Sequence, residues 1–231
     1  MYITKEQLLL AFKAAFPIML GYLGIGIPCG ILSDSIGLNA FQVFLLSLFL
    51  YSGAGQFMIC NLYMSSTPLL SIIASVALVN TRQSLYSISL APLAKPLGKF
   101  WSCVLACNVT DESYGVSMQK AYNGKWTAGQ AFALSCFSQS SWILATVLGV
   151  FIGSAISIPL AVAAFAMTSI FLCLLCMQQK TKINFITICF AIIGVAAAKL
   201  TGLGNVAILL GAVVGIAAGF IYYKVSDNAV E

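Results

Sequence analysis

The chain of 231 residues contains no histidine and few charged residues of either sign. Charged residues make up 7% of it, and only six of them are acidic, whereas charged residues make up about 25% of a typical soluble domain. The absence of histidine excludes Ser-His and Cys-His catalysis, histidine-based metal sites and histidine proton relays. We therefore expect neither an enzyme nor a metal protein, and no cofactor.

Apolar residues dominate what is present. They make up 61% of the chain, the mean hydropathy is +1.00, and apolar stretches long enough for a membrane helix recur along it. An isolated strand cannot satisfy its backbone in lipid, so such stretches are expected to be helical. The sequence predicts an all-α, polytopic membrane protein in which residues 1–231 form a single transmembrane domain.

Hydropathy and the positions of glycine and proline divide the chain into eight apolar segments. Polar residues interrupt two of these segments, at Asn80–Gln83 and at Asp111–Glu112. The eight segments are about 14–32, 41–63, 69–93, 99–122, 129–151, 158–177, 183–199 and 205–223.

The lysines predict how these segments cross the membrane, because basic residues of short loops prefer the cytoplasmic side. If both interrupted segments crossed fully, Lys95 and Lys99 would lie outside while the termini lay inside. If each is instead a pair of half-helices that enters and leaves on one side, the loop and terminal lysines are all cytoplasmic. We therefore predict six full spans plus two discontinuous helical elements, with eight ordinary spans as the alternative.

Glycine patterns predict two further features. The stretch "GYLGIGIPCG" at 21–30 indicates a kinked or partly unwound helix, and unwound backbone in a membrane borders a cavity. Gly211, Gly215 and Gly219 recur every four residues in the last segment. That spacing allows close helix packing, either within the chain or, alternatively, against a second subunit.

Arg82 is the one arginine of the chain, and it lies between apolar runs. An arginine at the bilayer centre costs about 2.5–3.5 kcal/mol on insertion scales, so such residues usually face the interior or a pathway. Its planar guanidinium fits a carboxylate. Arg82 could bind a substrate carboxylate or form an ion pair with Asp111 or Glu112, and both could occur in one transport cycle.

Asp111 and Glu112 are the acidic residues that lie between apolar segments. They could hold a substrate ammonium, carry a proton or pair with Arg82, or Asp111 could merely cap a helix in a solvated loop. Gln56 and Gln139 lie within two other polar clusters, "YSGAGQF" and "SCFSQSSW". Their amides could contact a ligand or bond between helices.

The motifs "FPIMLGYLGIGIPCG", "YSGAGQF", "VNTRQSLYS" and "DESYG" resemble, in this order and spacing, the AzlC family of branched-chain amino acid permeases. The resemblance extends from about Phe16 to about Leu175. It implies a multi-pass permease of the bacterial inner membrane that exports branched-chain or similar amino acids with a small AzlD-type membrane subunit. The positions that match the family's polar motif residues are Gln56, Asn80, Arg82, Tyr86, Asp111 and Glu112.

The chain departs from the family pattern twice. Gln83 follows the arginine where members often have histidine, and Ala164–Phe165 stands where many have an Asp-Phe pair. If that missing carboxylate couples transport to an ion elsewhere in the family, coupling here must use Asp111 or Glu112, or be absent.

The residues and the resemblance together predict a secondary transporter for small zwitterions, mainly hydrophobic amino acids. We expect substrate to be bound by Arg82, Asn80, Gln56, Tyr86 and Gln139, and an ion or proton to be coupled through Asp111 and Glu112. A channel-like facilitator, or a transporter for another zwitterion, is the alternative. No segment shows the charged stripe of a channel lumen.

Overall fold

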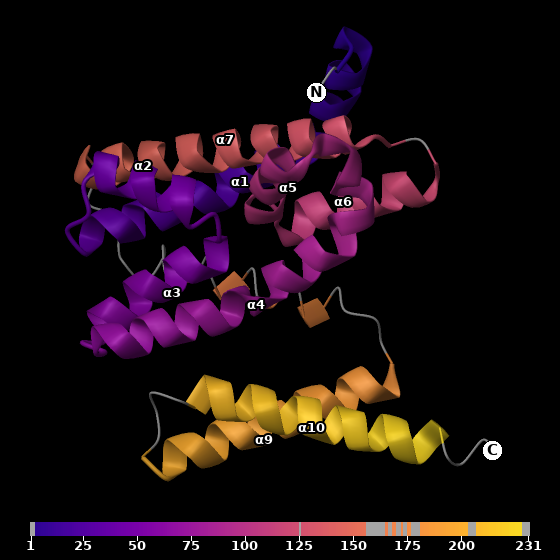
Figure 1. Cartoon of the computed structure of the whole chain (residues 1–231). Coiled ribbons are helices and arrows are strands. Elements are labelled where there is room, and N and C mark those ends of the chain that lie inside the picture. The colour runs from indigo at the N-terminus through magenta and orange to yellow at the C-terminus, as the bar shows by residue number, and fades with distance from the viewer. Residues whose placement is uncertain are drawn as a thin grey trace. The chain divides into compact units, whose positions relative to one another are not determined.

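The computed structural model describes residues 3–124, 126–155, 181–202 and 207–227, with a few single positions between 165 and 176. Every regular element in this part of the chain is helical (Figure 1). The chain forms two compact units, Met1–Thr168 and Ser169–Glu231, which we describe separately.

Within the described residues, the first unit contains seven α-helices and a short 3₁₀ helix, and the second contains a helical pair. Three of the described helices, α1, α7 and α9, are long and apolar enough to cross a membrane. The elements are α1 (Lys5–Ser35), α2 (Ala40–Phe49), α3 (Gly53–Met64), α4 (Leu69–Ala94), η1 (Lys95–Leu97), α5 (Lys99–Cys107), α6 (Asp111–Tyr122) and α7 (Ala128–Ala155), then α9 (Lys182–Leu200) and α10 (Ala207–Asp227).

Helices α1 and α7 lie side by side and run in the same direction (Figure 1). A Cβ atom added to Gly30 would lie 2.8 Å from the Cα of Gly149, and one added to Gly26 would lie 2.7 Å from the Cβ of Ala145. These glycines therefore permit close helix packing. Residues 21–30 were expected to be kinked or partly unwound, and the unwound alternative is wrong, because α1 continues as a helix through Pro28.

Helices α2 and α3 form a hairpin that turns at a break of the helix, residues 50–52. Ring packing of Tyr51 on Tyr22, with centroids 6.3 Å apart, places this first break beside the middle of α1. From there α3 returns toward the C-terminal end of α1, where the Ser33 hydroxyl lies 3.6 Å from the Cys60 sulfur. Both ends of the hairpin therefore lie at the same end of α1.

Helices α5 and α6 form a second hairpin, which turns at residues 108–110. The Ser102 hydroxyl donates to the Ala94 carbonyl (2.9 Å) at the end of α4, and the Ser87 hydroxyl donates to the Ala106 carbonyl (2.8 Å) nearer its middle. Helix α5 therefore runs from the C-terminal end of α4 back toward its centre, and α6 returns to the start of α7.

The structure confirms one of the two expected interruptions and corrects the other. The segment 99–122 is broken beside Asp111–Glu112, as predicted. The segment 69–93 is not broken, because Asn80–Gln83 contains neither glycine nor proline and α4 keeps its helical backbone there. The second break lies instead in 41–63, which was expected to be one span.

In the second unit, α9 and α10 pack as an antiparallel pair (Figure 1). A Cβ on Gly194 would lie 3.0 Å from the Cα of Gly211, and a Cβ on Gly215 would lie 2.7 Å from the Thr187 carbonyl oxygen. The glycine face of α10 therefore serves packing within the chain, the first of the two uses expected. The predicted span at 158–177 lies largely outside the described residues.

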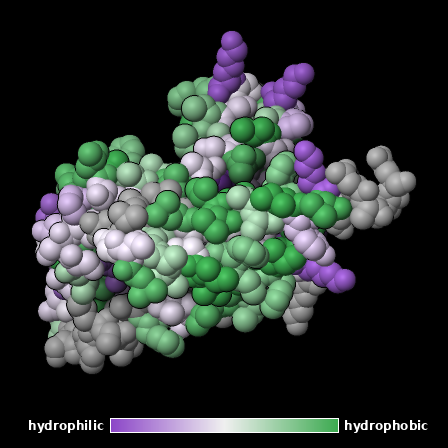
Figure 2. Space-filling model, turned by 90° about the horizontal axis from the view of Figure 1, so that it is seen from below, coloured by the Kyte–Doolittle hydropathy of each residue, from purple (hydrophilic) through white to green (hydrophobic). Residues whose placement is uncertain are grey.

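Polar and apolar side chains are distributed as in a protein surrounded by lipid. Hydrophobic residues cover the middle and right of the face in Figure 2, the left is paler, and strongly hydrophilic side chains lie mostly at the margin. Phe49 and Leu70 are 82% and 78% exposed, whereas Gln56, Ser47 and Thr146 are fully buried. Large apolar side chains are thus exposed while several polar side chains are buried, as expected for a protein in lipid.

The two hairpins generate a labelling prediction. In a variant without native cysteines, Leu97→Cys and Tyr122→Cys should react with a membrane-impermeant thiol reagent from one side, because α5–α6 folds back. Ser65→Cys, between α3 and α4, should react from the opposite side, because we expect the unbroken 26-residue α4 to cross the membrane. Labelling of positions 97 and 122 from opposite sides would show instead that 99–122 crosses the membrane.

Candidate functional site

The two helix breaks meet beside the middle of α1, and Tyr22 joins them. Its ring packs edge-on against Tyr51 of the first break. Its hydroxyl lies 2.8 Å from the Thr110 hydroxyl and donates at 2.8 Å to Oε2 of Glu112, both at the second break. Non-helical backbone at membrane depth occurs where it is buried in protein or lines a cavity. The meeting point of the breaks is therefore the candidate site.

Three glutamine amides satisfy backbone carbonyls at the first break. They come from three different helices, α7, α3 and α4, so the break is held from several sides. Each bond joins one side-chain nitrogen to one carbonyl oxygen: Gln139 to Leu48 (3.0 Å), Gln56 to Leu50 (2.9 Å) and Gln83 to Tyr51 (3.0 Å).

Gln56 uses both ends of its amide for contacts within the protein. Its oxygen accepts from the Trp142 indole (3.3 Å), the Ser47 hydroxyl (3.3 Å) and the Cys29 thiol (3.7 Å). The side chain is 0% exposed. Of the two roles left open for Gln56 and Gln139, ligand contact and hydrogen bonding between helices, this geometry favours bonding between helices. Contact of either amide with substrate stays a prediction.

The second break ends at the N-terminus of α6, where two acidic residues lie in the first turn. Thr110 is the N-cap, and its hydroxyl accepts from the Ser113 amide. The alternative in which Asp111 caps this helix is therefore wrong. Asp111 and Glu112 lie instead one and two positions further on, where the helix dipole favours negative charge.

Arg82 and Asp111 form an ion pair between α4 and α6, with 2.9 Å between Nη1 and Oδ2. Their side chains are 33% and 26% exposed. Nε of Arg82 and Oδ1 of Asp111 are buried, and neither atom has a hydrogen-bond partner among the described residues. Sequence alone allowed this pairing with either carboxylate, and the structure selects Asp111.

Tyr86 and Asn80 flank Arg82 on α4. Tyr86 lies close enough to both charges of the ion pair to interact with them, and its ring stacks on Tyr114 with centroids 4.6 Å apart. Asn80 accepts a hydrogen bond of 2.6 Å from the hydroxyl of Ser52, the N-cap of α3. Asn80 therefore contacts the first break, while Arg82 and Tyr86 lie at the second.

Sequence reasoning missed Tyr22 and Tyr51, and it noted Gln83 only as part of the polar interruption at 80–83 and as a departure from the family pattern. Ser52 before Gly-Ala-Gly is an N-cap and breaker signal that could have located the first break. The side-chain N–H of Gln83 donates to the Tyr51 carbonyl at that break. The imidazole N–H of a histidine, which family members often have at this position, could donate in the same way. Ala164, at the other departure, lies outside the described residues.

Long apolar helices, an apolar exterior and a polar centre at two helix breaks together define a multi-pass helical membrane protein. A family model described as "AzlC protein" matches residues 17–156, more than half of the chain and nearly all of α1–α7. The chain belongs to the AzlC family.

Curated relatives resemble the chain over most of its length. An "Uncharacterized membrane protein" of Helicobacter pylori is 32% identical over 78% of this chain and 80% of its own. "Inner membrane protein YgaZ" of Escherichia coli is 26% identical over 90% and 88%. "Branched-chain amino acid transport protein AzlC" of Bacillus subtilis is 24% identical over 73% and 68%. No solved structure matches.

The bonds at the first break predict the effect of Gln56→Leu, which keeps the size of the side chain but removes its amide. The Leu50 carbonyl and the Trp142 indole then lose partners, and each buried unpaired group costs about 1–3 kcal/mol. We expect a clear fall in melting temperature in detergent, measured beside Gln119→Leu, an exposed position on α6. Unchanged melting with loss of amino acid binding would instead support substrate contact.

Proposed function

We propose that this protein is a secondary transporter that exports branched-chain or related hydrophobic amino acids across a bacterial inner membrane. The proposal rests on its family, on the Bacillus subtilis relative named for branched-chain amino acid transport and on the Escherichia coli relative named as an inner membrane protein. The resemblance also implies a small AzlD-type membrane subunit as partner.

The observation that carries the proposal is the half-satisfied ion pair of Arg82 and Asp111. One donor, Nε, and one acceptor, Oδ1, remain buried without partners in the described part of the protein. An amino acid zwitterion carries the complementary groups, a carboxylate for the guanidinium and an ammonium for the aspartate. Substrate would therefore bind by adding to this ion pair or by replacing it.

The placement of the hairpins supports a transporter over a channel. Discontinuous helices near the membrane midplane build substrate sites in several transporter folds. In our proposal, α2–α3 enters from one side of the membrane and α5–α6 from the other, so that the two breaks meet at depth. When substrate leaves, Arg82 and Asp111 would pair with each other again, so that the charges of the empty site are neutralised.

The surroundings of the two carboxylates give them different roles. Asp111 has a cation at 2.9 Å, whereas Glu112 accepts from a phenol, Tyr22, and has no cation partner among the described residues. A carboxylate without a cation is the better candidate for taking up and releasing a proton. We assign proton coupling to Glu112 and substrate binding to Asp111.

The assignment of Arg82 predicts how its variants bind leucine. Arg82→Lys keeps the charge but loses the fork geometry, and loss of a hydrogen bond to a charged group costs about 1.5–3 kcal/mol, or about ten- to a hundred-fold in affinity. Arg82→Gln should bind almost nothing. Binding of labelled leucine to purified protein measures both, with the exposed Lys99→Gln as control.

A double variant separates binding from structure. Arg82→Gln should lower stability, because Asp111 loses its cation, and adding Asp111→Asn should restore stability but not leucine binding. A double variant that regains both stability and transport would show that the pair is purely structural.

The assignment of Glu112 predicts a loss of coupling rather than of binding. Glu112→Gln should abolish the dependence of leucine transport on a pH gradient, while exchange of leucine across the membrane continues. Asp111→Asn should weaken leucine binding instead. The measurement is flux in proteoliposomes with and without a gradient, and Glu6→Gln, an exposed change near the N-terminus, is the control. Normal gradient dependence in Glu112→Gln would remove it from coupling.

The same proteoliposomes test the function as a whole. Labelled leucine, isoleucine, valine and methionine should be transported, with and without a co-expressed small subunit. Flux that does not saturate and ignores the gradient would favour the alternative, a channel-like facilitator.

A further inference from the structure

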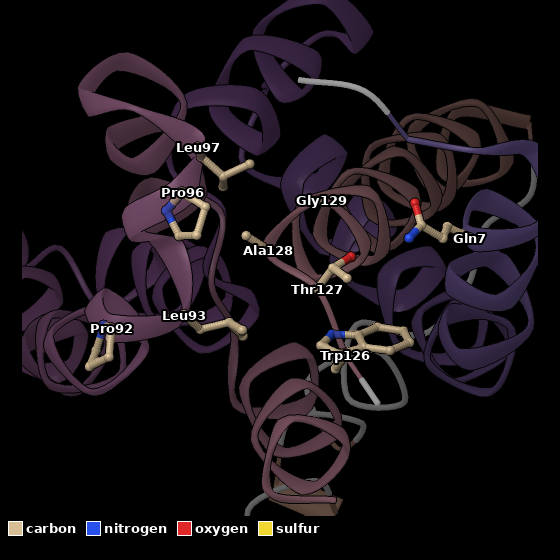
Figure 3. Close-up of a pocket in the computed structure, with 9 residues that line it drawn as sticks. All are labelled: Gln7, Pro92, Leu93, Pro96, Leu97, Trp126, Thr127, Ala128 and Gly129. Carbon is tan, nitrogen blue, oxygen red and sulfur yellow. The ribbon is translucent and has the colours of Figure 1, made fainter. Parts of the chain in front are cut away.

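A pocket of about 480 Å³ lies away from the helix breaks, at one end of the first unit (Figure 3). Three elements meet there: the start of α1, the end of α4 with η1, and the start of α7. Proline and leucine form one wall, and Trp126 and Thr127 face them. The lining residues are Gln7, Pro92, Leu93, Pro96, Leu97, Trp126, Thr127, Ala128 and Gly129.

The pocket contains a buried donor without a partner. Trp126 is 8% exposed, and its indole nitrogen has no hydrogen-bond partner among the described residues. Figure 3 shows the nitrogen-bearing edge of the ring on the side that faces Leu93 across the pocket. Because tryptophan usually places its N–H against an acceptor when it is buried, this geometry indicates a ligand with an acceptor oxygen.

The charges around the pocket are almost all positive. The Nζ atom of Lys120 lies 5.3 Å from the centre of the Trp126 ring. Two more exposed lysines, Lys5 and Lys95, belong to the segments that line the pocket, and the exposed Lys99 lies two residues beyond Leu97, against one acidic residue, Glu6. The acceptor that best complements this region is therefore anionic.

The position of the pocket indicates the rest of the ligand. It lies where α1, α4 and α7 begin or end, the level at which tryptophan and lysine meet the lipid headgroups. Its wall of Pro92, Leu93, Pro96 and Leu97 is apolar, as an acyl chain requires. Basic pockets between membrane helices on the cytoplasmic side are suited to anionic lipid headgroups.

We propose that this pocket binds one anionic phospholipid, with a phosphate oxygen accepting from Trp126 Nε1, Lys120 neutralising the headgroup, and the apolar part of the lipid against Pro92–Leu97. A lipid held there would join the ends of α1, α4 and α7. This site is independent of the amino acid site proposed above, because none of its lining residues lies at either helix break.

The test compares two phospholipids with the same acyl chains on the purified full chain in detergent. Phosphatidylglycerol should remain bound in native mass spectrometry and raise the melting temperature, and phosphatidylcholine should do neither. Trp126→Phe should bind phosphatidylglycerol about ten-fold more weakly, since it loses one hydrogen bond to a charged group. Trp101→Phe, the same change on α5 outside the pocket, should bind normally.

If Trp126→Phe fails to fold, Lys120→Gln still tests lipid binding, because Lys120 is exposed and its replacement should leave the protein folded. It should reduce the preference for phosphatidylglycerol over phosphatidylcholine, whereas Lys224→Gln on α10 should not. Equal binding of the two lipids, or normal phosphatidylglycerol binding by both pocket variants, would overturn the proposal. Equally tight binding of free glycerol 3-phosphate would show a phosphate site rather than a lipid site.

Discussion

The structure depends on one constraint: a backbone carbonyl freed at a helix break cannot remain unpaired in apolar surroundings. Hydrogen bonds to water are unavailable in the hydrocarbon region, so the protein must supply the donors. At the carbonyls of Leu48, Leu50 and Tyr51 it does so with the amides of Gln139, Gln56 and Gln83. Helices α3, α4 and α7 are therefore tied together at the depth where α2 ends.

Residues 80–83 of α4 contribute both to the bonding of the first helix break and to the ion pair at the second. Gln83 and Asn80 bond to the first break, while Arg82, between them in sequence, pairs with Asp111 at the second. Neighbouring positions on a helix point in different directions, so one polar stretch reaches two hairpins. Movement of either hairpin would therefore change the surroundings of the ion pair.

Much of the candidate site could be predicted, and the break positions could be predicted only in part. Arg82 and Asp111 stand out in the sequence because charges between apolar runs are expensive and need a reason. The polar stretch Asn80–Gln83 was expected to be the break itself, but it supplies side chains to breaks elsewhere. A polar stretch of sequence does not distinguish a helix that is broken there from an unbroken helix whose side chains bond to a break nearby. Both need the same residue types.

The sequence by itself determined that the protein is helical, that it lies in a membrane and that it belongs to its family, because composition and local motifs carry that information. Tertiary structure alone decided which carboxylate pairs with Arg82, that Tyr22 joins the two breaks, and that glycines 26 and 30 pack against α7 rather than unwind α1. The physical reason is distance along the chain. Tyr22 and Glu112, like Arg82 and Asp111, are brought together by helix packing, and no local pattern specifies which side chains such packing places within hydrogen-bonding reach.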